Sequence, residues 1–130
     1  MRSIALPRML GLAAIAACGG SGSGVDGQKL VVTLTPDEQL QLCEYFAAQA
    51  PPRTVTCSPT DIRMAGASTV PTCTSGLQML ASDHPRCAAT VAQSESCLAA
   101  LDRLSDLEIC TTAVPMPVEC APFRTPDCIN

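Results

Sequence analysis

The sequence predicts a small, mainly α-helical, disulfide-rich domain with three to four short helices and a possible minor β-hairpin. First, 130 residues suit a single domain. Second, nine residues are cysteine, whereas the only aromatic residues are one Tyr and two Phe, so the apolar core is small. Small extracytoplasmic domains compensate for such cores with disulfides. Third, three capping boxes precede stretches whose apolar residues recur at helical spacing.

Residues 1–17 are typical of a secretory signal peptide. Arg2 and Arg8 form a short basic segment, and residues 9–17 are an apolar run. Because a membrane-spanning helix needs about 20 apolar residues, this run is too short to remain as a span. We therefore expect a removable leader.

Cys18 ends that apolar run. The tetrapeptide Ile15-Ala16-Ala17-Cys18 resembles the lipobox of bacterial lipoproteins. The resemblance implies that Cys18 receives a diacylglyceryl thioether and becomes the first mature residue, which makes the membrane a partner through the lipid. Gly19 follows, and no acid occupies the second mature position, a pattern that permits export to the outer membrane of a Gram-negative host. Ordinary cleavage after Ala14-Ile15-Ala16 is the alternative.

Residues 18–28 are expected to comprise the lipidated cysteine and a Gly/Ser tether, and residues 29–130 the domain. Gly/Ser-rich linkers behave as random coils. Residues 30–34 (LVVTL) are β-prone. Thr35, Pro36 and Glu38 then predict a helix start, and Pro51 and Pro52 place its end near Gln49.

The next segments predict a possible strand over residues 53–57, mostly loop over 58–71, and a helix over about 74–82. The capping box Thr90–Gln93 begins the clearest helix, whose apolar stripe reaches Leu104. The box Ser105–Glu108 predicts a short helix through Cys110. The proline-rich tail is expected to be extended and held by its cysteines.

Eight cysteines remain without Cys18, an even number that allows four structural disulfides in 105 possible pairings. No CxxC pair occurs, which argues against redox and zinc-ribbon chemistry. The sequence alone leaves the pairing open. The eight are Cys43, Cys57, Cys73, Cys87, Cys97, Cys110, Cys120 and Cys128.

The segments LTPDEQLQLCEYFA, VTC, TCTSGLQML, TVAQSESCLAAL and ECAPF together resemble a group of small cysteine-rich predicted lipoproteins of myxobacteria. The resemblance covers residues 34–123. It implies an envelope location and a disulfide-stapled architecture, and it implies no activity.

Charge and motifs exclude several functions. Without the leader, 6 basic residues face 12 acidic ones, which disfavours nucleic-acid binding. No P-loop, dinucleotide fingerprint or EF-hand loop occurs, so we predict no cofactor and no metal. The acid pairs Asp37/Glu38 and Asp106/Glu108 fall in predicted first turns, where carboxylates favour the helix dipole. We predict no catalytic residues.

The leading interpretation is therefore a cell-envelope lipoprotein anchored through Cys18, with a structural or binding role toward an envelope protein or ligand. A small envelope hydrolase is one alternative, with His84, a serine and either Asp83 or Asp102. A secreted disulfide-rich effector or inhibitor module is the other, if Cys18 is not acylated.

Overall fold

The computed structural model describes residues 22–111 and 116–129, and within them the chain is a mainly helical domain with one β-hairpin. This confirms the predicted fold class. The elements, in chain order, are η1 (Val31–Thr33), α1 (Pro36–Gln49), β1 (Arg53–Ser58), β2 (Asp61–Ala65), α2 (Val70–Asp83), α3 (Val91–Asp102), α4 (Asp106–Cys110) and η2 (Val118–Phe123), where η marks a 3-10 helix.

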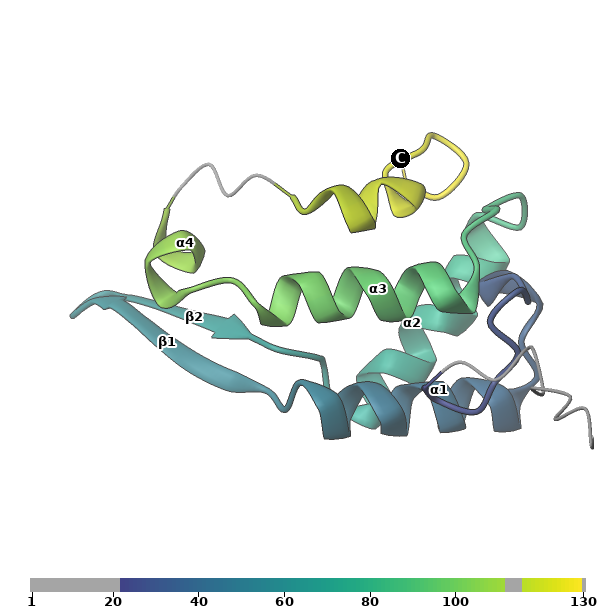
Figure 1. Cartoon of the computed structure of the whole chain (residues 1–130), viewed down its shortest axis with the longest axis horizontal. Coiled ribbons are helices and arrows are strands. Elements are labelled where there is room, and N and C mark those ends of the chain that lie inside the picture. The colour runs from purple at the N-terminus through teal and green to yellow at the C-terminus, as the bar shows by residue number, and fades with distance from the viewer. Residues whose placement is uncertain (1–21, 112–115, 130) are drawn as a thin grey trace, which may run out of the picture.

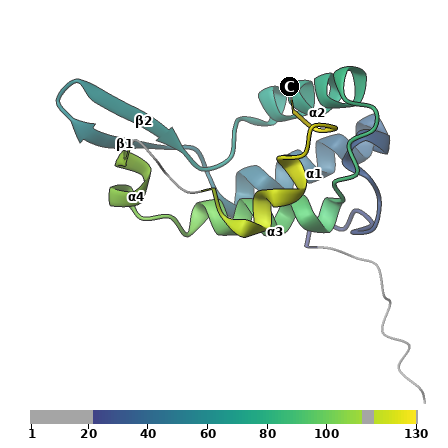
Figure 2. The same ribbon diagram turned by 90° about the horizontal axis from the view of Figure 1, so that it is seen from above.

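The three longer helices form the body of the molecule (Figure 1). Helix α1 packs against both α2 and α3, and η2 lies along α3 on the side away from α1. The hairpin leaves the end of α1 and extends beyond the helices, and the short helix α4 packs beside it (Figures 1 and 2). The molecule is thus a helical body with a projecting hairpin.

Three helices begin at the capping boxes that the sequence predicts. The side chains of Thr35, Thr90 and Ser105 each accept a hydrogen bond from the backbone N–H three residues later. The Glu or Gln side chain at that later position accepts a hydrogen bond from the backbone N–H of the cap residue. Helix α2 starts earlier than predicted, at Val70. Pro71 is compatible with this start because backbone N–H groups in the first turn of a helix have no intrahelical acceptor, so the N–H that proline lacks is not needed.

Strand β2 lies where the sequence predicted mostly loop. Strands β1 and β2 pair antiparallel, with Thr54 opposite Met64 and Thr56 opposite Ile62. Gly66 then returns the chain toward the body with φ +86°, and the Ala67 N–H donates to the Ala50 carbonyl at 2.7 Å. A side chain at Gly66 would collide with the Pro51 carbonyl, so glycine is required there.

Residues 30–34, which the sequence predicts to be β-prone, do not form a strand. They contain the single turn η1 and one isolated bridge between Leu30 and Thr90. Its Val31 is fully buried in the core cluster, where η1 packs against α2. The predicted extended tail is likewise a 3-10 helix, η2, over part of its length. The buried core cluster comprises Val25, Val31, Leu34, Leu42, Cys87, Ala89, Val91 and Cys128.

Candidate functional site

The chain enters the domain at residues 22–28, which were predicted to be a free tether. The N–H groups of Gly22 and Ser23 donate to the two carboxylate oxygens of Glu95, each at 3.1 Å. The side chain of Gln41 donates to the Ser23 carbonyl at 2.8 Å, and Val25 is buried in the core. A random coil therefore does not describe residues 22–28, because their backbone groups and one apolar side chain have partners in the body.

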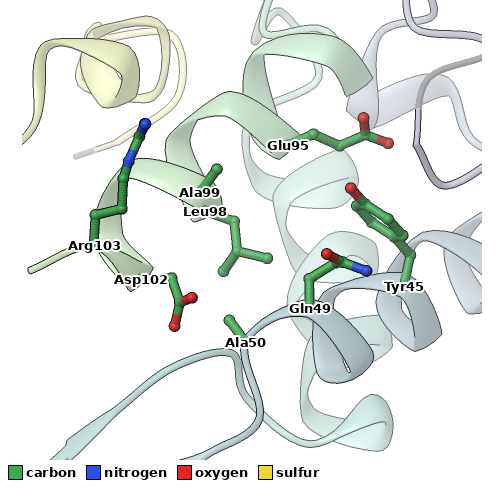
Figure 3. A pocket seen from close by; sticks show the side chains of 8 residues that line it. All are labelled: Tyr45, Gln49, Ala50, Glu95, Leu98, Ala99, Asp102 and Arg103. Carbon is green, nitrogen blue, oxygen red and sulfur yellow. The ribbon is translucent and has the colours of Figure 1, made fainter.

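A groove of about 240 Å³ lies between α1 and α3, next to this entry segment. Figure 3 shows Tyr45 and Glu95 facing each other from the two helices, with Asp102 and Arg103 toward the opposite end. Ala50 and Leu98 contribute apolar surface between them. The groove is lined by Tyr45, Gln49, Ala50, Glu95, Leu98, Ala99, Asp102 and Arg103.

The groove offers hydrogen-bonding groups rather than a reactive set. Glu95 is engaged by the entry segment, and Gly22 packs so closely against Tyr45 that a side chain at this position would collide with the Tyr45 hydroxyl. Arg103 lies 4.0 Å from Glu119, a loose ion pair. Among the lining residues no serine, cysteine or histidine accompanies the carboxylates. The arrangement suits binding of a small polar molecule or a side chain from a partner.

His84, the centre of the hydrolase alternative, caps the end of α2 and is half-buried. It lines a pocket of about 250 Å³ with Asp83, Pro85, Arg86, Pro126 and Asp127, and the Arg86 Nη2 lies 3.5 Å from the Asp127 Oδ1. Carboxylates are therefore present. The serine that the hypothesis requires is not among these described lining residues, and Asp102 lines the α1–α3 groove instead.

The eight downstream cysteines form four disulfides: Cys43–Cys73, Cys57–Cys110, Cys87–Cys128 and Cys97–Cys120. The pairing could not be chosen from the sequence. Cys43–Cys73 joins α1 to α2, and Cys97–Cys120 joins α3 to η2. Because four disulfides persist only under oxidising conditions, the domain belongs to an extracytoplasmic compartment. In the described ranges no cluster of three or more His, Cys, Asp or Glu could hold a metal ion.

In the first turns of α1 and α4, Glu38 and Glu108 cap the helix ends, whereas Asp106 forms an ion pair with Arg53 of β1 at 2.6 Å. Lys29 Nζ donates to both oxygens of Glu38 at 2.7 and 2.8 Å, and these bonds, with one from the Thr35 N–H, hold the pKa of Glu38 below its ordinary value. The Ser105 N–H and hydroxyl lower the pKa of Glu108 in the same way. Both carboxylates are thus structural caps.

Cys18 and the expected leader lie outside the described residues. Within those residues, no helix is both long enough and apolar enough to cross a membrane. Comparison of the chain with protein-family models, with curated proteins and with solved structures finds no match.

Proposed function

We propose that the protein is a cell-envelope lipoprotein, anchored through a lipid on Cys18, with a binding role. One observation carries the proposal. The eight downstream cysteines pair with one another, which leaves Cys18 as the one cysteine of nine without a cysteine partner in the set. It follows Ile15-Ala16-Ala17, the context in which acylation is expected. An unmodified thiol would be reactive in an oxidising compartment.

The packed entry segment supports a close attachment. Only residues 19–21 separate Cys18 from Gly22, whose N–H is bonded to Glu95. At about 3.3–3.6 Å per residue, the four steps from Cys18 to Gly22 span at most about 14 Å. A stable anchor needs two or more acyl chains, and a lipidated cysteine supplies them. The domain would then be held near the bilayer surface, and the α1–α3 groove, whose wall includes Glu95, would be near it too.

Metabolic labelling with palmitate tests the anchor. The wild-type chain, expressed in a bacterial host that acylates lipoproteins, should incorporate label and sediment with the membranes. A Cys18→Ser variant should lose both properties. Ser21→Ala, a change in the same short segment, should retain both. Label and membrane association that persist in the Cys18→Ser variant would overturn the proposal.

A further inference from the structure

Strand β2 presents an unpaired edge. In the described part of the chain the sheet has two strands, so each has one edge without a strand neighbour. Helix α4 contacts β1 more extensively than β2, and β1 has an irregular register between Thr56 and Ser58. Packing and irregularity of this kind protect a strand edge against pairing. The regular edge of β2 is the less protected of the two.

The outer face of the hairpin is uncharged and exposed. It carries the cross-strand pairs Thr54–Met64 and Thr56–Ile62, and Ile62 and Met64 are 62% and 71% exposed. The inner face carries Val55 and Arg63, and the Arg63 Nη1 donates to the Ile109 carbonyl of α4 at 2.7 Å. One face is therefore covered by the chain itself, whereas the other leaves two large apolar side chains in solvent.

The sequence of β2, Asp-Ile-Arg-Met-Ala, is complementary to itself. If two copies of β2 pair antiparallel about Arg63, Ile62 of each copy lies opposite the partner's Met64. The four apolar side chains then form one cluster on the outer face, where directly opposite residues have Cβ atoms about 4.5–5.5 Å apart. Asp61 lies opposite the partner's Ala65, so the two acidic groups do not face each other.

Electrostatics also permit this pairing. The Arg63 guanidinium is bound by both Asp61 oxygens of its own chain, at 3.0 and 3.2 Å, so each β2 brings a neutralised arginine to the two-fold axis. The hairpin also projects beyond the three longer helices (Figures 1 and 2).

We propose that the β2 edge is a self-association surface, at which two copies of this chain join their hairpins into one four-stranded antiparallel sheet. The contact is isologous, as expected for a two-fold dimer. Because five residues a side make a small interface, the affinity is modest, with a Kd on the order of 100 µM. The surface is independent of the lipid anchor.

Sedimentation equilibrium of the exported mature chain, in density-matched detergent, measures this association whether or not Cys18 is acylated. The wild type should shift from monomer to dimer as its concentration rises. Met64→Lys and Ile62→Lys each put a charged side chain opposite an apolar side chain of the partner, where it loses solvent, and should raise the dimer Kd at least about tenfold. Met79→Lys is the matched control, because Met79 on α2 is 63% exposed and lies outside the hairpin. It should dimerise as the wild type does.

Amide hydrogen exchange of the same samples reports the surface used. Protection of alternate β2 amides should increase with protein concentration in the wild type and in Met79→Lys, and not in Met64→Lys. Circular dichroism confirms that each variant is folded. A wild-type chain that stays monomeric at about 1 mM, ten times the expected Kd, overturns the proposal. So does self-association without new protection in β2, or an equal loss in Met64→Lys and Met79→Lys.

Discussion

The Glu95 carboxylate, on the second turn of α3, accepts a hydrogen bond from the backbone N–H of Gly22, 73 residues earlier in the sequence. Its other oxygen binds the next N–H, that of Ser23. This one side chain makes the end of the Gly/Ser tract a part of the domain. It also fixes where the chain leaves the domain for Cys18.

Removal of the Glu95 carboxylate should therefore release the entry segment. Hydrogen bonds to a charged group contribute about 1.5–3 kcal/mol, and these two are partly exposed, so we expect Glu95→Ala to cost about 1–2 kcal/mol of unfolding free energy. Amide exchange at Gly22 and Ser23 should become faster. The control is Asp102→Ala, an exposed carboxylate on the same helix. Equal amide exchange in the two variants would contradict the assigned role.

The two glycines near and within α2 should respond in opposite directions to alanine. Gly66→Ala adds a Cβ about 2.4 Å from the Pro51 carbonyl oxygen at a positive φ, and should destabilise the domain by about 1–3 kcal/mol. Gly76 lies inside α2 with open space around it, so Gly76→Ala should stabilise by about 0.5–1 kcal/mol. Denaturant unfolding under oxidising conditions measures both. A stable Gly66→Ala variant would show that the return from β2 differs from the one described.

Loss of the Cys57–Cys110 disulfide and loss of the Cys87–Cys128 disulfide should unfold different parts of the molecule. Cys57 and Cys110 are half-buried and fasten β1 to α4, whereas Cys87 and Cys128 are 0% and 4% exposed within the core cluster. Cys57→Ser/Cys110→Ser should lose protection in the hairpin and α4 while α1–α3 stay folded. Cys87→Ala/Cys128→Ala should cost about 2–5 kcal/mol across the whole domain.

Residue-level hydrogen exchange distinguishes these two outcomes. Both variants remove one disulfide, and the loops that the bonds close have similar sequence separations of 53 and 41 residues. Loss of loop closure alone would therefore destabilise them by similar amounts. Global unfolding of both variants to the same extent would contradict the separation between body and hairpin.

Acid should weaken the fold through the capping carboxylates. The pKa of Glu38 is lower in the folded chain than in the unfolded chain, because Lys29 and Thr35 bind its ionised form. The stability it contributes is present above the unfolded value of about 4.3 and is lost as the pH falls through the folded pKa. The unfolding free energy should therefore decrease below about pH 5.

A Glu38→Gln variant keeps a side-chain acceptor for the Thr35 N–H and removes the titrating charge. Its unfolding free energy should fall less steeply with acid than that of the wild type. Glu44→Gln, an exposed change on the same helix, should leave the wild-type slope in place. Unfolding followed by circular dichroism between pH 3 and pH 7 checks this, and parallel curves for Glu38→Gln and wild type would argue against the effect.

Local signals account for what was predictable. The boxes at Thr35, Thr90 and Ser105 are complete within four residues, so the starts of α1, α3 and α4 follow from the sequence. The missed strand β2 has alternation, but its solvent-facing residues are Ile62 and Met64. The strand β1 was expected over residues 53–57, but its pairing with β2 and the contact of β2 with α4 become visible only in three dimensions. A strand whose apolar side chains face solvent and whose charged side chain faces the protein cannot be recognised from a single sequence.

The entry segment and the groove were missed for a related reason. Glycine and serine favour a flexible tether, and Val25 alone is a weak indication of a buried residue. Glu95, which accepts hydrogen bonds from this segment, and Gln41, which donates one to it, lie on helices that are distant in sequence. The groove likewise depends on how α3 packs against α1, which helical periodicity does not specify.

The intact mass of the exported mature protein tests the central claim most directly. We predict a chain that begins at Cys18, carries the mass of a diacylglyceryl group on that residue, and lacks two hydrogens for each of the four disulfides. Peptide fragmentation should place the acyl mass on Cys18. An unacylated Cys18, or an acyl group on another residue, would contradict the account.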